Sequence, residues 1–198
     1  MSTSTLDFED NLQEDTIRKQ IWQQLQRASV DKHHEWRSPV LVTNGLSRVE
    51  DDAPNNWPDA RTVILRAVDL NSNKLTFYTD SRSPKVLQLL TNPNALLVFW
   101  SKRLNSQLRI KVSISVITDG ELHQKTWAIV KQSASAKDYL SSAAPGELLT
   151  NNNNQPQLAT PHFAMLVAQV INIDWLVLNR NGHQRASITS NSFNYTAP

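Results

Sequence analysis

The chain has 198 residues, of which 39% are hydrophobic and 19% charged, with 20 basic and 18 acidic side chains. This composition is typical of a globular protein and excludes a disordered or fibrous chain. Lys and Arg never occur in runs longer than two, so nucleic acid is not an expected partner. The lack of cysteine excludes disulfides and thiolate metal sites.

No apolar stretch reaches the length of a membrane span, and residues 1–11 lack the basic start and apolar core of a secretory signal. We therefore expect a soluble, cytoplasmic protein without a membrane partner. The length favours a single domain over 1–198. The Asn-rich tract at about 150–158 predicts a flexible loop.

An amphipathic packing helix is predicted over about residues 9–28. Ile17, Ile21 and Leu25 recur there at spacings of four between polar residues. A short β-rich run at 40–43 follows, and then a loop-heavy region.

From Arg61 the hydrophobic period changes to two. The pattern predicts a strand through Ala67 and an antiparallel strand over 75–79. Ser83 followed by Pro84 is a helix-start signature, because serine caps helices and proline suits the first helical position.

The second half of the chain predicts further strands. An apolar run at 95–100 indicates a buried strand, and strict alternation over 107–117 indicates a half-buried one. Residues 120–142 predict one or two helices, 163–178 two strands or one long bent strand, and 183–189 a last strand. About six antiparallel strands with few helices predict a mainly β fold, a barrel or a sandwich.

The common catalytic motifs are missing. Four scattered glycines cannot form a dinucleotide-binding or phosphate-binding loop, and neither HExxH nor GxSxG occurs. The five histidines show no metal-ligand spacing, so no metal is expected.

An anion-binding pattern remains at the helix that starts at Pro84. Arg82, Ser83 and Lys85 gather where free backbone N–H groups and the helix dipole favour a phosphate. Arg61 and Arg66 lie on the preceding strand. The alternative interpretation makes Arg82 and Lys85 solvated surface charges and Ser83 only a cap.

Three segments in order then resemble the FMN-binding core of the pyridoxamine 5′-phosphate oxidase family: Arg61-Thr62-Val63-Ile64-Leu65-Arg66, Phe77-Tyr78-Thr79-Asp80 and Ser83-Pro84-Lys85. Gln107 and Lys131-Gln132-Ser133 match later family positions. The resemblance covers about 61–133 well and 163–185 loosely. It points to the oxidase-related branch found in cyanobacteria and plants.

The resemblance implies a six-stranded antiparallel split β-barrel that forms a homodimer with FMN at the subunit interface. Arg61 and Lys85 would hold the phosphate, Gln107 the polar edge of the flavin, and Gln132 would come from the partner subunit. The residues implied to bind FMN are Arg61, Thr62, Val63, Ile64, Arg66, Tyr78, Thr79, Arg82, Ser83, Lys85, Gln107, Gln132, Ser133 and Arg185.

Departures from the family pattern concern the substrate. The Tyr, Arg and Ser contacts to the substrate phosphate have no counterpart between Gln107 and Gln132, and the arginine of the family's Ser-Arg-Lys is replaced by Pro84. The family's flavin-contacting tryptophan is replaced by Leu176. Trp175 lies beside it, on what should be the opposite face, and is a candidate for closing over a ligand.

We therefore expect an FMN-dependent oxidoreductase with altered substrate contacts. A non-catalytic flavin-binding or flavin-storing protein is the alternative. A barrel that has exchanged FMN for haem is a third possibility, against which the retained Arg61, Lys85 and Gln132 argue.

Overall fold

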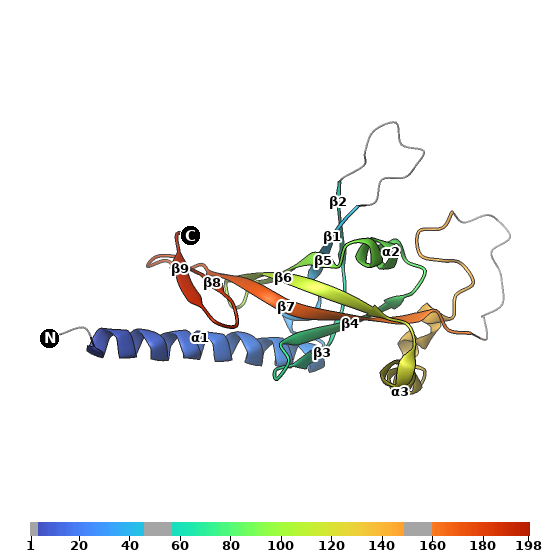
Figure 1. Cartoon of the computed structure of the whole chain (residues 1–198), viewed down its shortest axis with the longest axis horizontal. Coiled ribbons are helices and arrows are strands. Elements are labelled where there is room, and N and C mark those ends of the chain that lie inside the picture. The colour runs from blue at the N-terminus through green and yellow to red at the C-terminus, as the bar shows by residue number, and fades with distance from the viewer. Residues whose placement is uncertain (1–3, 46–56, 149–159) are drawn as a thin grey trace.

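The computed structural model describes residues 4–45, 57–148 and 160–198, and within these ranges its centre is a nine-stranded antiparallel sheet (Figure 1). The strands are β1 (Val40–Asn44), β2 (Pro58–Thr62), β3 (Leu65–Asp69), β4 (Lys74–Asp80), β5 (Asn94–Ser101), β6 (Ser106–Ile117), β7 (Phe163–Val177), β8 (Gln184–Ile188) and β9 (Phe193–Thr196). The helices are α1 (Ser4–Val30), α2 (Pro84–Thr91) and α3 (Gly120–Val130), with 3-10 turns η1 (Glu35–Arg37) and η2 (Ala134–Tyr139).

The sheet follows the order β2-β1-β5-β6-β7-β4-β3, and β8 pairs with both β7 and β9. Strand β7 organises this arrangement. It pairs with β6 along most of its length, with β4 over 163–169 and with β8 over 173–177. Ile171 forms a β-bulge between the part of β7 that pairs with β4 and the part that pairs with β8. Lys111 lies opposite Asn172 while Val112 lies opposite Val170, so Ile171 has no residue opposite it.

The predicted mainly β class is confirmed, but the prediction of six strands is too low. The segment predicted as one strand from Arg61 to Ala67 is divided between β2 and β3. At the break the Val63 amide donates to the Pro39 carbonyl at 3.0 Å, and the chain leaves β1 to pair with β4. Strand β9 was not predicted. The Asn-rich loop predicted at 150–158 lies outside the described residues.

The main core lies between α1 and the sheet. The helix predicted over 9–28 is observed as α1, and it buries Ile17, Ile21 and Leu25 against the sheet side that carries Phe77 and Phe99. The spacing of four places these residues on one face, so burial of this stripe stabilises the helix more than its propensity does.

A second, aromatic cluster attaches α3 and η2 to the start of β7. The Phe163 ring, only 2% exposed, lies 5.2 Å from the Tyr78, His123 and Tyr139 rings and 5.4 Å from the Trp127 ring, centroid to centroid. The tilted and edge-on geometries are those that aromatic pairs prefer.

His34 makes the stability depend on pH. Its Nδ1 accepts the Trp36 amide, so Nε2 carries the proton and donates to Gln24 at 2.9 Å. Burial, followed by the nearby Arg103 charge, holds its pKa below the ordinary value of 6.5. Below pH 6.5 the unfolded chain therefore binds a proton at this imidazole more readily than the folded chain does. As the pH is lowered further, the free energy of unfolding decreases by up to about 1.4 kcal/mol for each pH unit.

Urea unfolding at pH 7.5, 6.5 and 5.5 measures this effect. We expect His34→Gln to flatten the dependence on pH and His33→Gln, at the exposed neighbouring position, to preserve it. Equal slopes for the two variants would contradict the role of His34.

Candidate functional site

Four side chains form a cationic cluster where β2, β4 and the start of α2 meet. We call Arg61, Thr79, Ser83 and Lys85 the phosphate cradle. The Lys85 ammonium donates to Thr79 Oγ1 at 3.1 Å, and this hydroxyl lies 3.2 Å from Ser83 Oγ. Ser83 precedes α2 but makes no side-chain capping bond, so its hydroxyl is not used by the helix. The cradle therefore brings two cations and two hydroxyls together.

The Arg61 guanidinium is held in a fixed orientation. It donates to Thr43 Oγ1 at 2.5 Å and to Gln88 Oε1 at 3.1 Å, and it pairs with Asp59. The Gln88 amide also donates to Asp59 at 2.9 Å. An arginine held in this way loses little further entropy when it binds an oxyanion.

The electrostatics of the cradle favour an anion. Burial and the neighbouring Arg61 charge lower the pKa of Lys85, although Asp80 and Asp59 act in the opposite direction. Two half-buried cations side by side are relieved by a doubly charged phosphate, which accepts charge-assisted hydrogen bonds from both. The residues present therefore fit the phosphate of FMN.

Arg82, by contrast, has other partners. Its guanidinium pairs with the buried Asp80 at 2.7 Å and donates to the carbonyl oxygens of Ser141, Ser142 and Ala143. These contacts clamp residues 141–143 beside the turn before α2. A contact between Arg82 and the phosphate stays a prediction.

Arg66 and Tyr78 lie beside the cradle. Arg66 is the extra residue of a β-bulge, because Leu65 lies opposite Phe77 while Ala67 lies opposite Thr76. Its guanidinium lies 5.6 Å from the centre of the Tyr78 ring, and its buried Nε has no hydrogen-bond partner. The bulge thus places an incompletely paired cation next to the aromatic cluster.

Gln107 and Arg185 lie elsewhere, on the outer face of β6 and β8. Both flank Leu176 of β7, and Arg185 donates two hydrogen bonds to Asp174 at 2.9 and 2.7 Å. Arg109 pairs with the same carboxylate. Trp175 is buried on the opposite face, as predicted.

The remaining predicted residues occupy connecting segments. Gln132 and Ser133 are exposed between α3 and η2, where Ser133 Oγ donates to the Val130 carbonyl. Thr62 ends β2, and Val63 and Ile64 form the link to β3. Apart from Arg82 and residues 62–64, the predicted residues therefore fall into three groups within one protomer: the cradle with Arg66 and Tyr78, the outer-face pair Gln107 and Arg185, and the turn after α3.

Sequence reasoning missed the supports of the cradle. Thr43 faces Asp59 across β1 and β2, and Gln88 lies one helical turn after Lys85 on α2. The spacing of Lys85 and Gln88 was the only local signal for this network. No neighbouring residue in the sequence indicated that Asp174 would pair with Arg185.

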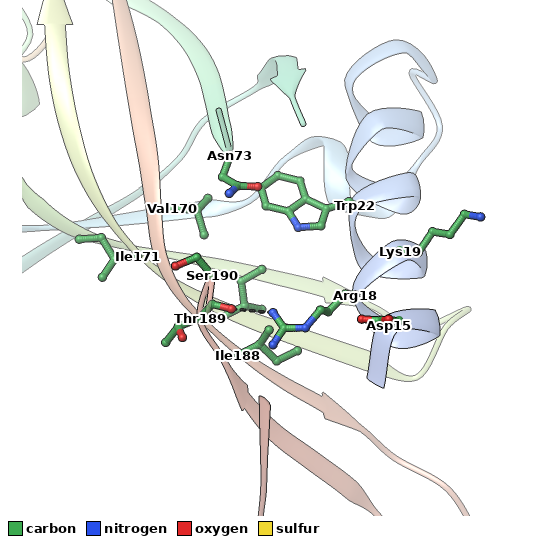
Figure 2. A pocket seen from close by; sticks show the side chains of 11 residues that line it. Asp15, Arg18, Lys19, Trp22, Asn73, Val170, Ile171, Ile188, Thr189 and Ser190 are labelled. Carbon is green, nitrogen blue, oxygen red and sulfur yellow. Dashed lines mark hydrogen bonds between the residues drawn. The ribbon is translucent and has the colours of Figure 1, made fainter. Parts of the chain in front are cut away.

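A hollow of about 400 Å³ lies between α1 and the bulged part of β7 (Figure 2). Trp22 and Asn73 both line it, and Arg18 donates to the Thr189 carbonyl at 2.6 Å. None of the predicted FMN residues lines this hollow. Among the described residues no group of three or more metal-ligating side chains occurs, and no helix combines the length and hydropathy of a membrane crossing.

Comparison with known families identifies the domain. Residues 19–118 match the family described as pyridoxamine 5′-phosphate oxidase, FMN-binding domain. The chain is similar to pyridoxine/pyridoxamine 5′-phosphate oxidases from Azorhizobium caulinodans, 38% identical over 68 residues, and Microcystis aeruginosa, 36% identical over 69 residues. These matches cover 34% and 35% of the chain and 31% of each relative.

Solved structures share the fold. A pyridoxamine 5′-phosphate oxidase-related, FMN binding protein from Nostoc punctiforme PCC 73102 superposes with a TM-score of 0.68 at 23% identity, over 91% of this chain and 96% of that one. PhzG from Burkholderia lata 383, solved with tetrahydrophenazine-1-carboxylic acid, superposes with a TM-score of 0.65 at 16% identity. This match covers 99% of this chain and 97% of that one.

Proposed function

Because the chain belongs to the pyridoxamine 5′-phosphate oxidase FMN-binding domain family, and FMN is therefore its cofactor, we propose that it is an FMN-dependent oxidoreductase with altered substrate contacts. The phosphate cradle carries this proposal, since its two cations and two hydroxyls suit the FMN phosphate. Bound FMN supplies the electron transfer, so the protein needs to bind, orient and shield the flavin rather than provide a nucleophile. We also place the protein in the cytoplasm, as a single-domain subunit.

We further propose that the flavin site is shared by two subunits. Thr79 lies opposite Ala164, and Arg185 lies opposite Leu176, twelve residues further along β7. At about 3.3 Å per residue, these positions are separated by up to about 40 Å, farther than one flavin nucleotide reaches. Figure 1 shows the two ends of β7 well apart. A homodimer can supply the cradle from one subunit, and Gln107 and Arg185 from its partner.

Mixing two defective variants tests the shared site. Lys85→Ala and Arg185→Ala each damage both sites of their own homodimer. After mixing and subunit exchange, each mixed dimer would hold one intact site and one doubly damaged site. We therefore expect tight FMN binding to return to about a quarter of all sites in an equal mixture.

Equilibrium titration of the mixture with FMN, beside sedimentation of each protein, measures this recovery. A mixture that binds no more tightly than its components, or a stable monomer with full FMN occupancy, would contradict the shared site.

A non-catalytic flavin-binding protein is the second candidate. It is favoured by the commitment of Arg82 to Asp80 and to backbone carbonyls, since the family's substrate contacts nearby are also missing. Reduction of the bound flavin by pyridoxamine 5′-phosphate, pyridoxine 5′-phosphate and a panel of small amines, followed in the visible spectrum under anaerobic conditions, separates the two. Bleaching by one compound, with recovery in air, supports the oxidoreductase. A flavin that no compound reduces supports the binding protein.

A further inference from the structure

The two hydroxyls of the phosphate cradle are closed off from solvent in this structure. Thr79 is only 8% exposed and Ser83 only 2%, and their hydroxyl oxygens lie 3.2 Å apart. Because buried hydroxyls in a close-packed protein cannot be reached from solvent, a phosphate contacts them only after a neighbouring segment has moved. The cradle therefore needs a segment that opens when FMN enters and closes behind it.

Among the described segments next to the cradle, residues 141–147 have the least support. They form neither helix nor strand, and residues 145–147 are exposed. By contrast, β2 and β4 are paired with β1 and β7, and α2 buries Val86 and Leu89. Segments with few buried contacts open most readily. Residues 141–147 can therefore move without disturbing the sheet.

This segment is held against the start of α2 at two points. At the first point, the Arg82 guanidinium donates to the three carbonyl oxygens of residues 141–143, at 2.8, 2.9 and 3.3 Å. At the second, Gly146 packs against Pro84, since a Cβ atom on this glycine would lie 3.7 Å from Pro84 Cγ. Pro84 is flanked in the sequence by two cradle residues, so the segment lies directly beside the cradle.

Asp80 fixes the side chain that holds the segment. This carboxylate is 6% exposed and accepts hydrogen bonds from Arg82 Nε at 3.1 Å and from a terminal guanidinium nitrogen at 2.7 Å. It also accepts the Arg82 backbone amide at 2.8 Å, while the Asp80 carbonyl accepts the Ser83 amide at 3.1 Å. The turn that places Ser83 in the cradle and the guanidinium that holds residues 141–143 are therefore one hydrogen-bonded unit.

A tight turn at residues 144–147 completes the second contact. The Ala144 amide donates to the Glu147 carboxylate at 2.8 Å, and the Glu147 amide donates to the Ala144 carbonyl at 3.1 Å. Gly146 has φ +87°, in the left-handed region that favours glycine. This turn brings Gly146 against Pro84.

We propose that Arg82 is a latch, which holds residues 141–147 closed beside the phosphate cradle so that FMN enters and leaves only when this segment opens. The inference rests on the proposed FMN site, and it makes Arg82 a positioning residue that does not contact the phosphate. The contacts of the latch join only parts of the protein, so opening is equally favourable with and without FMN. Such a gate slows entry and exit by the same factor and leaves the dissociation constant unchanged.

Arg82→Lys tests the latch in the full chain, because lysine keeps the charge beside Asp80 but lacks the planar fork that also reaches the carbonyls. We expect the association and dissociation rate constants of FMN both to rise at least about tenfold, the effect of one charge-assisted hydrogen bond. The dissociation constant should stay within about threefold of the parent value. Lys137→Arg, at an exposed position of η2, exchanges the same two cations and should leave both rates unchanged.

Stopped-flow flavin fluorescence measures the association rate, and release of radiolabelled FMN into excess unlabelled FMN measures the dissociation rate. Amide hydrogen exchange gives a readout that does not depend on the flavin. We expect residues 141–147 to exchange at least about tenfold faster in Arg82→Lys, with and without FMN, while the central strands exchange as in the parent.

Glu147→Ala is a second variant, at an exposed position where folding is not at risk. It removes the bond to the Ala144 amide and should raise both rate constants by about two- to tenfold. Asp138→Ala removes a carboxylate from the preceding turn and should change neither rate.

Faster release of FMN with unchanged association in Arg82→Lys would make Arg82 a direct phosphate contact and overturn the latch. Unchanged rates, in spite of faster hydrogen exchange, would show that residues 141–147 do not control the cradle. Unchanged exchange would show that Arg82 does not hold them. A parent protein that binds no FMN would refute the proposed function itself, and the latch with it. Should Arg82→Lys fail to fold, parent-like rates in Glu147→Ala would overturn the inference.

Discussion

Replacing Lys85 with alanine is expected to weaken FMN binding by roughly 10- to 150-fold. The ammonium lies beside Arg61 and Thr79, and a charge-assisted hydrogen bond to phosphate is worth about 1.5–3 kcal/mol. Titration of the apoprotein with FMN, followed by quenching of the flavin fluorescence, measures the change.

The same variant should leave the apoprotein at least as stable as the parent. Without phosphate, burial and the Arg61 charge both disfavour the Lys85 ammonium, as its lowered pKa indicates. Removing it costs the bond to Thr79 and the attraction of Asp80 and Asp59, but it relieves the burial of the charge and the repulsion from Arg61, which are the two larger effects. Lys32→Ala, at an exposed position, is the matched control and should bind FMN like the parent. Parent-like affinity in Lys85→Ala would remove Lys85 from the phosphate site.

Replacing Phe163 with alanine is expected to lower the free energy of unfolding by about 3–5 kcal/mol. The ring is buried among Tyr78, His123, Trp127 and Tyr139, so its loss leaves a cavity that four rigid rings cannot fill. Urea unfolding followed by tryptophan fluorescence measures the loss.

The position of Phe163 adds a second consequence. Its cluster attaches α3, and α3 leads to Gln132 and Ser133. Phe163→Ala should therefore also weaken FMN binding, if these residues complete the site of a partner subunit. Leu122→Ala removes an exposed apolar side chain from the same helix and should cost under about 0.5 kcal/mol. A loss below 1 kcal/mol for Phe163→Ala would show that the cluster is not a stabilising core.

The parts of the fold that depend on local pattern could be predicted from the sequence. Strand β6 alternates strictly because one face meets the core, and α2 begins at Pro84, directly after Ser83, where the helix-start signature predicts it. The break between β2 and β3 could not be predicted, because it depends on which strand the chain pairs with next. Alternation of apolar and polar residues shows which face of a strand is buried, but not which strand it pairs with.

In the candidate site, too, the residues close together in sequence could be predicted and their distant partners could not. The cradle residues were predicted because three of the four lie within seven consecutive positions, 79–85, where a helix start and basic side chains coincide. Their supports are distant in sequence: Thr43 is 18 residues from Arg61 and 45 from Gln88. The partners of Arg82 could not be predicted either, since its guanidinium meets carbonyls about 60 residues away.

The bulge at Ile171 adds one residue between two halves of β7 that each alternate regularly. Before the bulge the even-numbered Leu166 and Ala168 face the main core, and after it the odd-numbered Ile173 and Trp175 do. Deleting this one residue would place Asn172 directly after Val170 and still opposite Lys111, so the strand would alternate without a break and Ile173 and Trp175 would still face the core. We therefore expect deletion of Ile171 to remove the local bend of β7 while both halves of the strand keep their core residues in place.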